Sequence, residues 1–586
     1  MTETDATGSS FSIAVVGSGG AGVMTIGNLL LDAAAQAGFY ALMTRSFGPQ
    51  IRGGEAGALL RLATYPVDTV DDAYDLLLGV DWKNAERFAG EIPLTAASVI
   101  IADPAAGEVP PEFSGAGARV VELPMQQLAK EVSGGRPNMV ALGALAALIG
   151  IAQETLAEVL DRKLVKKGRE MIQASLDSAA RGAALAEDLH VGFSLAAPAP
   201  GEPGSRWSIT GNQAAALGAI RGGVRFAAAY PITPATDVLE WLAPALPKVG
   251  GALVQAEDEL ASINMALGAS YGGRPSFTAT SGPGVSLMSE AIGLGVASET
   301  PVVVLDVMRG GPSTGIPTKS EQTDLNIALY GLHGDAPHLV LAPNSIPDCL
   351  FTLQWAVFLA EMLQTPAIVL SDQAMGQARA VIERPSDVAF LGRRAVVQEI
   401  DPEVGYQRYA LTASGVSPVA LPGTPGGQHT ADGLEHNEAG TPSARAPDHL
   451  AQLDKRLRKL VQFDYGAHWA QIEGDTDSPF AVLTWGSTMP TVRDGIARAR
   501  ADGMPVRLIS PRLLYPARPD AMAAALEGVE RILVIEHSHS GQFTRYLRAE
   551  YDLPCRPETF NRPGPAPKIR PADVHERLMT WRNSHA

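Results

Sequence analysis

Short apolar runs rich in β-branched residues alternate with longer helical stretches along most of the chain. The first run, Phe11–Val16, ends at Gly17, and the helical stretch Val23–Ala37 that follows it stops at Gly38. This alternation predicts α/β domains throughout. Several runs are almost wholly apolar, as expected for parallel strands that helices cover on both faces. Further strands are predicted at Leu76–Val80, Ser98–Ala102, Phe226–Ala229, Leu253–Gln255, Ser276–Ala279, Val302–Val307, Ala367–Leu370, Ala481–Thr484, Pro505–Leu508 and Ile532–Ile535.

Breaks in this pattern divide the chain into segments. The Pro/Gly-rich stretch LAAPAPGEPGSR (195–206) is typical of a linker. Residues Ser417–His449 have no apolar period and many turn formers, so they predict a long loop that is ordered only if it packs on something else. A helix begins again within Asp454–Leu460. The predicted segments are an α/β domain at 11–190, a linker at 191–207, a second α/β domain at 208–375, a connecting segment at 376–477 and a smaller α/β domain at 478–586.

Composition excludes several classes of protein. Of the 586 residues, 46% are hydrophobic and 19% charged, which is typical of folded domains rather than of disordered chains. Asp and Glu outnumber Lys and Arg by 63 to 46, and a net charge of −17 disfavours nucleic-acid binding. The N-terminus lacks the basic and apolar regions of a signal peptide, and no apolar run reaches the roughly 18 residues of a membrane span. We therefore expect a cytoplasmic protein.

The cysteine content limits the redox chemistry that the chain can perform alone. Only Cys349 and Cys555 occur in the sequence. Two distant thiols cannot supply the four thiolates of an iron–sulfur cluster or of a Cys-rich zinc site. Cys349 lies in the apolar run PDCLFTLQWAVFLA and is expected to be a small buried side chain. If the chain takes part in redox chemistry, the electrons must leave through another polypeptide.

A glycine-rich loop follows the first predicted strand. Its sequence GSGGAG (17–22) fits the G-x-G-x-x-G pattern of dinucleotide-binding sites, in which glycines and a helix N-terminus accept phosphate groups. A nicotinamide site would also need an acidic residue at the end of the second strand, to bind the ribose. The predicted second strand, Phe39–Met43, ends instead in Thr44-Arg45. The alternative is that these glycines only permit a tight turn.

Two arginines lie close together after the second strand. The run RSFGPQIRGGE (45–55) places Arg45 and Arg52 beside a Gly-Pro turn and a Gly-Gly pair. Arginine forks bind carboxylate or phosphate groups, so this run is a candidate anion site. Solvated loop charges are the simpler interpretation.

Four chemically distinctive loops follow four predicted strands of the second domain. They are YPITPAT (230–236), QAEDELA (255–261), TSGPG (280–284) and RGGPSTG (309–315). In a parallel sheet the carboxyl ends of neighbouring strands meet at one edge, where α/β proteins bind ligands. Each loop alone has a structural interpretation, such as a rigid proline turn or a helix N-terminal charge cluster. Together they bring a hydroxyl group, a carboxylate, a Gly-Pro-Gly turn and an arginine to one place, which indicates a site.

These motifs resemble those of the 2-oxoacid:ferredoxin oxidoreductases. YPITPAT, QAEDELAS, TSGPG and RGGPSTGIPTKSEQTDL look like the alpha subunit of that family. GSGGAGV, RSFGPQIRGGEA and NMVALG (138–143) look like its gamma subunit, and TWGST and EHSHSGQFTRYLRAE look like its transketolase-C-terminal-like domain. The resemblance covers nearly the whole chain in gamma-then-alpha order. It implies a multidomain α/β protein with a Rossmann-like gamma domain, a pyrimidine-type thiamine diphosphate domain and a transketolase-C-terminal-like domain.

The resemblance implies a reaction and residues for the cofactor. Enzymes of this family decarboxylate a 2-oxoacid on thiamine diphosphate, pass electrons to iron–sulfur centres and release an acyl-CoA. In the family, a glutamate hydrogen-bonds the aminopyrimidine ring of the cofactor and favours the tautomer that removes the proton from its C2 atom. Glu259 matches this glutamate best, and Glu257 is the alternative. Pro231 and Ile232 are further candidates for cofactor contact.

The resemblance also implies residues for the substrate. Thr233 and Arg309 match the residues that hold the substrate carboxylate, for which a permanent planar charge is suited. The fused arrangement with PSTGIPTK is most similar to the 2-oxoglutarate enzymes, whose substrate has a second carboxylate. Lys319, Arg52 and Arg45 are the candidates to bind that distal group. Pyruvate and branched-chain 2-oxoacids remain alternative substrates.

A partner subunit follows from what the sequence lacks. The family's beta subunit carries a Gly-Asp-Gly motif for the metal and diphosphate and the cysteines of the cluster, and this chain contains neither. The resemblance therefore implies thiamine diphosphate with Mg²⁺ shared with a beta subunit, an iron–sulfur cluster in that partner, ferredoxin as acceptor and an (αβ)₂ assembly. CoA is the implied acyl acceptor, and Gly19, Gly20 and Gly22 are candidates to bind its phosphates.

Two other functions compete with this one. An NAD(P)-linked enzyme would use the loop at 17–22, but the ribose-binding acid is missing and the motifs at 230–315 are richer. A non-catalytic scaffold would not be expected to retain Glu259, Thr233 and Arg309 together.

Histidines and acids in the long loop are conceivable metal ligands. Their irregular spacing favours a solvated or partner-facing loop, and we predict no metal site in this chain. The residues in the loop are His429, Glu435, His436 and Glu438. Outside it, His333, His338, His537 and His539 also show no ligand spacing.

Overall fold

The described residues form two compact units, each of which is treated by itself. The computed structural model describes residues 6–48, 54–189, 191–198, 205–403, 405–564 and 568–583. Unit 1 comprises Met1–Thr210, Gln377–Ser386 and Ala566–Asp573, and unit 2 comprises Gly211–Gly376, Asp387–Pro565 and Val574–Ala586. Arg52, a predicted substrate residue, lies outside the described residues.

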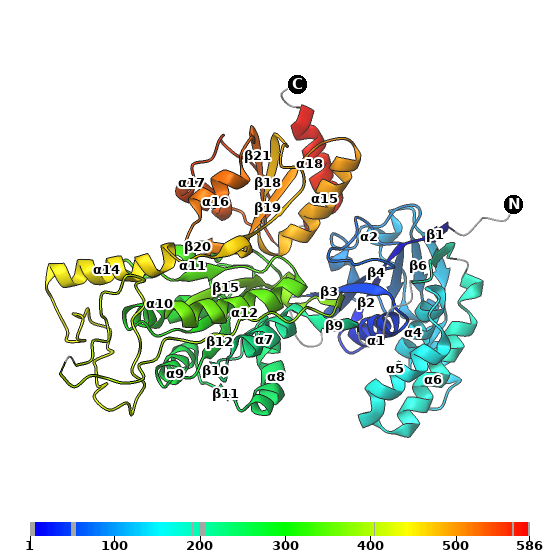
Figure 1. The fold of residues 1–586 in the computed structure, drawn as a ribbon. Coiled ribbons are helices and arrows are strands. Elements are labelled where there is room, and N and C mark those ends of the chain that lie inside the picture. Colours follow the sequence, from blue (N-terminus) through cyan, green and yellow to red (C-terminus); the bar gives the residue numbers. More distant parts are fainter. Residues whose placement is uncertain are drawn as a thin grey trace. The chain divides into compact units, whose positions relative to one another are not determined.

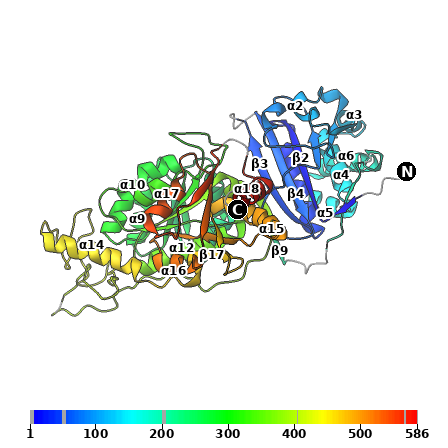
Figure 2. The same ribbon diagram turned by 90° about the horizontal axis from the view of Figure 1, so that it is seen from above.

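Unit 1 is built on a mixed sheet (Figures 1 and 2). Two of its strands lie after residue 190 in the sequence, outside the domain predicted at 11–190. Within the described part of unit 1 the sheet has eight strands, in the spatial order β7 (Arg119–Glu122), β6 (Val99–Ala102), β5 (Leu76–Gly79), β2 (Ser10–Ser18), β4 (Glu55–Ala63), β3 (Tyr40–Phe47), β16 (Arg379–Glu383) and β9 (Arg206–Thr210).

The strand after the first helix differs from its prediction. β3 does not end at Met43 but continues through Arg45 to Phe47, because β4 pairs with it along its whole length. β3 is antiparallel to β4 and to β16, and β4 separates it from β2. Strands β2 and β3 run in the same direction but are not neighbours, so with helix α1 (Val23–Gln36) they do not form the β-α-β unit of adjacent strands found in a nicotinamide-binding fold.

Two helices of unit 1 pack closely against each other at glycine residues, which have no side chain. A Cβ atom at Gly143 would lie 1.9 Å from the carbonyl oxygen of Ala179, and one at Gly182 would lie 1.9 Å from that of Val140. The NMVALG motif thus lets two helices, α4 and α6, touch through their backbones. The helices are α1, α2 (Pro111–Ser114), α3 (Met125–Lys130), α4 (Pro137–Leu148), α5 (Gln153–Leu164) and α6 (Arg169–Ala184), and β1 (Ala6–Gly8) pairs with β8 (Phe193–Leu195).

The larger sheet of unit 2 carries the predicted site at its edge. Six of its strands are parallel neighbours, and the last, from the C-terminal region, is antiparallel. The two strands that the sequence did not predict are three residues long, too short for a recognisable pattern. In the described part of unit 2 the order is β11 (Ala252–Gln255), β10 (Phe226–Ala229), β12 (Ser276–Thr280), β13 (Val303–Met308), β15 (Ala367–Asp372), β14 (Leu339–Leu341) and β20 (Leu513–Tyr515).

By length and composition alone, one helix of unit 2 could cross a membrane. This helix, Ile346–Leu363, is 78% buried inside the protein, as expected of a core helix. Cys349 on it is fully buried, as predicted, and burial raises the pKa of its thiol. The helices of this region are α7 (Gly211–Gly222), α8 (Thr236–Ala245), α9 (Glu259–Tyr271), α10 (Gly282–Ala297), α11 (Leu325–Tyr330), α12 (Ile346–Leu363) and α13 (Gln373–Gln377).

The C-terminal region of unit 2 has its own sheet and is tied to α12. Arg512 donates hydrogen bonds of 2.8 and 3.0 Å to the carboxylate of Asp348 on α12. Among the described residues the sheet has five strands, in the order β17 (Ala470–Glu473), β19 (Arg507–Pro511), β18 (Phe480–Leu483), β21 (Arg531–Glu536) and β22 (Glu558–Asn561). The helices here are α15 (Met489–Ala501), α16 (Pro519–Ala525), α17 (Gln542–Glu550) and α18 (Pro571–Asn583).

The predicted long loop ends earlier than expected. Helix α14 spans Ala446–Val461 and therefore includes the last residues of the loop predicted at Ser417–His449 (Figure 1). Pro447 stands in the first turn of the helix, where proline is tolerated. The loop packs on this helix, where Arg456 donates to Glu435 at 2.6 Å. The segment before the loop packs there too, because Gln452 donates to the carbonyl of Tyr409 at 2.9 Å.

The face of α14 that is buried carries charge. Lys455 and Lys459 both donate to the fully buried Glu299, the second at 3.1 Å. Burial disfavours the charged form of Glu299, but the charges of Lys459, Lys455 and Arg408 lower its pKa. Removing one partner of such a buried pair is strongly destabilising, so this cluster fixes the connecting segment to the residues that follow α10.

Candidate active site

Four loops begin at one edge of the larger sheet of unit 2. Strands β11, β10, β12 and β13 are neighbours and run parallel, so their carboxyl ends lie at the same edge. The motifs YPITPAT, QAEDELA, TSGPG and RGGPSTG follow these strands directly. The structure therefore brings together the four loops that the sequence predicted to converge.

A hydrogen bond joins the two most distinctive motifs. The Nη1 atom of Arg309 donates to the main-chain carbonyl of Thr233 at 2.6 Å. Asn212, buried on α7, donates to the next carbonyl of the YPITP turn at 3.0 Å and holds that turn against the helix. Pro231, Ile232 and Thr233 are half-buried. Thr233 and Arg309 thus meet, as predicted, at the ends of two strands.

Arg309 presents an unsatisfied donor inside the site. Its side chain is buried, and its Nε atom has no hydrogen-bond partner among the described residues. Burial lowers the pKa of the guanidinium group, and the charge of Asp324 opposes that shift. An unpaired buried donor is costly, so the arrangement fits a ligand that accepts a charge-assisted hydrogen bond, such as a carboxylate.

The three adjacent acids of QAEDELA have different environments. Asp258 is the N-cap of α9 and accepts a hydrogen bond from the amide of Ala261 at 2.7 Å. Glu257 is exposed to solvent. Glu259, the first residue of α9, is only 7% exposed, and the described residues give its carboxylate no hydrogen-bond or ion-pair partner. Of the two glutamates predicted to contact the cofactor, Glu259 is therefore the buried one.

The Gly-Pro-Gly turn lets helix α10 begin beside Glu259. A Cβ atom at Gly284 would lie 2.8 Å from Cγ of Glu259 and 1.9 Å from Oγ1 of Thr280. A Cβ atom at Gly282 would lie 2.5 Å from a carboxylate oxygen of Asp324. Both glycines are needed because acidic side chains occupy the space on either side of the turn.

The loop after Arg309 folds back on itself. The amide of Gly310 donates to the carbonyl of Lys319 at 2.9 Å, and the amide of Ile316 donates to the carbonyl of Gly310 at 2.7 Å. The backbone of Lys319 is thereby held next to Gly310. Arg45, another candidate for the distal carboxylate, lies on β3 of unit 1.

The same loop joins the site to the C-terminal sheet of unit 2. Gln322 is fully buried, donates to the carbonyl of Trp485 at 2.7 Å and accepts from the amide of His537 at 2.9 Å. Glu536, in the EHSHSGQF motif, accepts bonds of 2.9 Å from the amides of Phe543 and Thr544. This motif therefore supplies a carboxylate to the N-terminus of α17, a structural role.

Two buried carboxyl groups near the site were not predicted from the sequence. Asp306 lies on β13 and is fully buried, and Asp324 stands just before α11 with its Oδ2 atom buried. The signal in the sequence is a single acid inside the otherwise apolar strand VVLDVM. A lone acid in a buried strand must either pair with another group or keep its proton.

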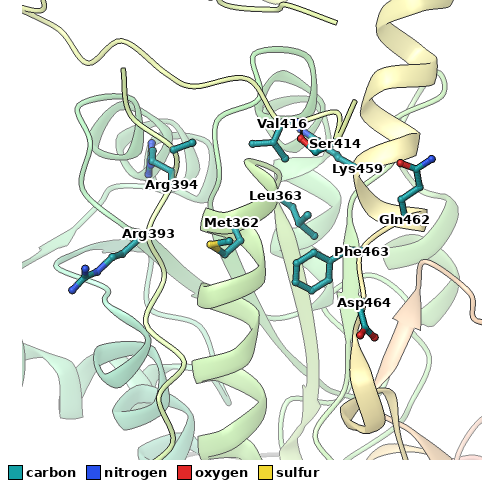
Figure 3. Close-up of a pocket in the computed structure, with 11 residues that line it drawn as sticks. Met362, Leu363, Arg393, Arg394, Ser414, Val416, Lys459, Gln462, Phe463 and Asp464 are labelled. Carbon is teal, nitrogen blue, oxygen red and sulfur yellow. Dashed lines mark hydrogen bonds between the residues drawn. The ribbon is translucent and has the colours of Figure 1, made fainter. Parts of the chain in front are cut away.

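A cavity of about 690 Å³ in unit 2 is distinct from this site (Figure 3). Met362 and Leu363, at the end of α12, line it together with Arg394 and Lys459. α12 leads into the start of β15, so the cavity lies at the opposite edge of the sheet. The guanidinium of Arg394 is bound to Glu361 at 2.7 Å, and Lys459 is bound to Glu299. These cations are satisfied, and the cavity is not the catalytic site.

The histidines and acids of the long loop are used in contacts other than metal binding. Glu435 binds Arg456 and His449, Glu438 accepts from the amide of Leu411, and His436 stacks on Tyr409. In the described ranges no three His, Cys, Asp or Glu side chains are placed to hold one metal ion.

The glycine loop of unit 1 already faces a carboxylate. Asp81 accepts two bonds from Ser18, at 3.0 Å from its amide and 2.7 Å from its hydroxyl. Gly20 and Gly22 have positive φ angles of 96° and 93°, which favour glycine. A Cβ atom at Gly22 would lie 2.3 Å from the side-chain amide nitrogen of Asn138, at the start of α4. The glycines thus serve a tight turn and the approach of two helix N-termini.

The isolated chain is not expected to bind a nicotinamide at this loop. β3, the strand after α1, is not a neighbour of β2 and ends in Ser46-Phe47, so it offers no acid for the ribose. Titration calorimetry with NADH and NADPH should therefore show no binding in the micromolar range. Micromolar binding that Gly20→Ala abolishes would contradict this expectation, and Gly90→Ala, at an open position, is the control.

Comparison with known protein families finds two matches along the chain. Residues 12–185 match the family "Pyruvate ferredoxin/flavodoxin oxidoreductase", and residues 217–455 match "Pyruvate flavodoxin/ferredoxin oxidoreductase, thiamine diP-bdg". The fold and the loops at the sheet edge thus define an oxidoreductase with a thiamine diphosphate-binding domain.

Individual relatives identify the family. A 2-oxoglutarate:ferredoxin oxidoreductase from Magnetococcus marinus, solved with 2-oxoglutarate, coenzyme A and succinyl-CoA bound, is 37% identical, with a TM-score of 0.89 over 98% of this chain and 99% of that one. The 2-oxoacid:ferredoxin oxidoreductase subunit alpha of Saccharolobus solfataricus is 29% identical over 91% of this chain and 92% of its own length. The 2-oxoglutarate synthase subunit KorA of Methanothermobacter thermautotrophicus is 36% identical over 58% of this chain and 90% of its own length. This chain belongs to the 2-oxoacid:ferredoxin oxidoreductases, as a counterpart of their alpha subunits, which confirms the predicted family and α/β multidomain class.

Proposed function

We propose that this chain is the gamma-fused alpha subunit of an enzyme that oxidatively decarboxylates 2-oxoglutarate, with CoA, to succinyl-CoA and CO₂. The observation that carries the proposal is the match along 98% of the chain to an enzyme solved with 2-oxoglutarate, CoA and succinyl-CoA. The buried, unpaired Nε atom of Arg309 supports it, because that atom lies where an anionic substrate would be bound.

Arg309 and Thr233 bind and orient the 2-oxoacid. The guanidinium keeps Nη1 on the carbonyl of Thr233, which leaves Nε to donate to the C1 carboxylate. The hydroxyl of Thr233, on a half-buried turn, is a second donor for the substrate. A planar cation fixes the direction of the C1–C2 bond, which must be aligned before CO₂ can leave.

Glu259 holds the aminopyrimidine end of thiamine diphosphate, with Pro231 and Ile232 on the neighbouring turn. When bound, the cofactor supplies carbanion chemistry at its C2 atom. A mostly buried carboxylate without a partner among the described residues fits a ring nitrogen that must exchange a proton. This chain has no Gly-Asp-Gly motif, so a beta subunit supplies the groups for the diphosphate and Mg²⁺.

Two electrons leave with each turnover through a partner. The reaction converts a 2-oxoacid and CoA to acyl-CoA, CO₂, a proton and two electrons. Two cysteines cannot build a cluster, so the beta subunit carries the iron–sulfur centre and ferredoxin takes up the electrons. We propose an (αβ)₂ assembly. The phosphates of CoA are assigned to Gly19, Gly20 and Gly22, where two helix N-termini meet at Asn138.

Substrate preference tests the proposal. In the complex with its beta subunit, kcat/KM for 2-oxoglutarate should exceed that for pyruvate at least about tenfold, because a charge-assisted contact is worth roughly 1.5–3 kcal/mol. Lys319→Ala should lower the value for 2-oxoglutarate and leave that for pyruvate unchanged, whereas Lys248→Ala, at an exposed position, should change neither. Equal turnover of both substrates by the wild type would mean that the distal contact does not exist.

A further inference from the structure

The carboxyl groups of Asp306 and Asp324 lie together, and the charge of Asp324 acts on Arg309. Asp306 is fully buried, and neither of its carboxylate oxygens accepts a hydrogen bond from a donor in the described part of the chain. The Oδ2 atom of Asp324 is also buried without such a donor. The side chain of Asp324 packs against Gly282, the first residue of α10.

Two ionised carboxylates could not remain in this position. A buried carboxylate without a donor costs several kcal/mol, and a second negative charge beside it adds repulsion. A single proton between the two groups removes the repulsion and creates an O–H···O hydrogen bond. Burial and the neighbouring acid raise the pKa of Asp306 well above its usual range, and burial raises the pKa of Asp324 to about 6.

The remaining negative charge faces a cation. The charged groups that act on the pair, among the described residues, are Glu321 and Arg309, both on the loop that follows β13. Of these two, Arg309 has the opposite sign, and Asp324 is the acid whose charge acts on its guanidinium.

We propose that Asp306 and Asp324 share one proton and that their single remaining negative charge positions Arg309 for the 2-oxoacid. Asp306 holds the proton, and Asp324 carries the charge. The carboxyl pair neither touches the substrate nor transfers a proton to it; it keeps the guanidinium in one orientation between the YPITP turn and the substrate. The kinetic part of this inference rests on the proposed function, whereas the shared proton does not.

Infrared spectroscopy tests the shared proton on the purified chain, without substrate or partner. The difference spectrum of wild type minus Asp306→Asn at pH 7 should contain the carbonyl band of a protonated carboxyl group. Glu361→Gln is the control. Burial raises the pKa of Glu361 as well, but its ion pair with Arg394 at 2.7 Å opposes that shift, so its difference spectrum should lack that band. Absence of the band in the Asp306→Asn difference spectrum would overturn the shared proton, whatever the activity of the enzyme.

Kinetics of the complex with the beta subunit test the positioning role. Asp306→Asn replaces the protonated acid by an amide donor and should keep kcat/KM within about threefold of wild type. The double variant Asp306→Asn/Asp324→Asn removes the charge and should lose roughly ten- to hundredfold in kcat/KM, as expected for a misplaced binding group. The decrease in wild-type kcat/KM below about pH 6, where Asp324 takes up a proton, should be absent from the double variant.

The outcomes separate this inference from the proposed function. If the double variant matches the wild type at every pH, the pair has only a structural role and the positioning proposal fails. If Asp306→Asn loses as much as the double variant, Asp306 carries the charge and the assignment of the proton fails. If the double variant does not fold, the single variant Asp324→Asn serves instead. Absence of the low-pH decrease in kcat/KM from this variant would support the positioning role, and a decrease like that of the wild type would contradict it. A wild type without 2-oxoacid turnover would reject the proposed function but leave the infrared result standing.

Discussion

Glu259→Gln should lower turnover of the 2-oxoacid by roughly 10²–10⁴-fold, the range in which general acid–base groups contribute. Glutamine fills the same buried space at the start of α9 but cannot exchange a proton with the aminopyrimidine ring. The direct measurement is exchange of the C2 proton of thiamine diphosphate in the complex with the beta subunit, by quenched-flow and NMR. Exchange should be abolished while the complex still assembles.

Glu257→Gln is the matched control for this change. Glu257 stands two residues earlier, is exposed to solvent and should tolerate the same substitution with normal exchange. Normal exchange in the Glu259 variant together with loss in the Glu257 variant would transfer the role to Glu257. Normal exchange in both would reject a glutamate of this loop as the activating group.

Arg309→Ala should lower kcat/KM for the 2-oxoacid at least about tenfold, because a charge-assisted partner is worth roughly 1.5–3 kcal/mol. The loss should be larger than that measured for Arg309→Lys, which keeps the charge but not the planar fork. Steady-state kinetics of the assembled enzyme measure both variants. The alanine variant also frees the carbonyl of Thr233, so its melting temperature should be compared with that of the wild type.

Arg393→Ala provides the control for general loss of positive charge. Arg393 is exposed at the cavity near α12, at the other edge of the sheet, and its removal should leave kcat/KM unchanged. Equal values for Arg309→Ala and wild type, with an intact fold, would remove Arg309 from the substrate site.

The sequence predicted the elements around the site well because each has a local signal. β10 spans Phe226–Ala229 as predicted, β11 and β12 differ from their predictions by one residue at one end, and β13 is shifted by one residue at both ends. Apolar runs bounded by Gly, Pro and acids define these strands, and their parallel order follows from the helices between them. The convergence of the four loops could therefore be inferred from the sequence alone.

Other features depend on contacts between distant residues and had no local signal. The extension of β3 to Phe47 comes from its pairing with β4, and β9 joins the first sheet only through β16, about 170 residues later. The resemblance favoured Glu259 over Glu257, but the burial of Glu259 and the exposure of Glu257 became visible only with the first turn of α9. The shared proton of Asp306 required its neighbour Asp324, 18 positions away in sequence.

Dependence on a partner is the most direct test of the account. Thiamine diphosphate held only at its aminopyrimidine end lacks most of its charge-assisted contacts, and electron removal needs thiolates that this chain does not have. The decisive measurement is 2-oxoglutarate-dependent reduction of a viologen dye under anaerobic conditions, with iron content and visible spectrum recorded on the same samples. The chain alone should be colourless, free of iron and inactive, and addition of a cysteine-rich beta subunit should restore absorption, cofactor binding and turnover together. Turnover by the chain alone, with iron bound to it, would contradict the account.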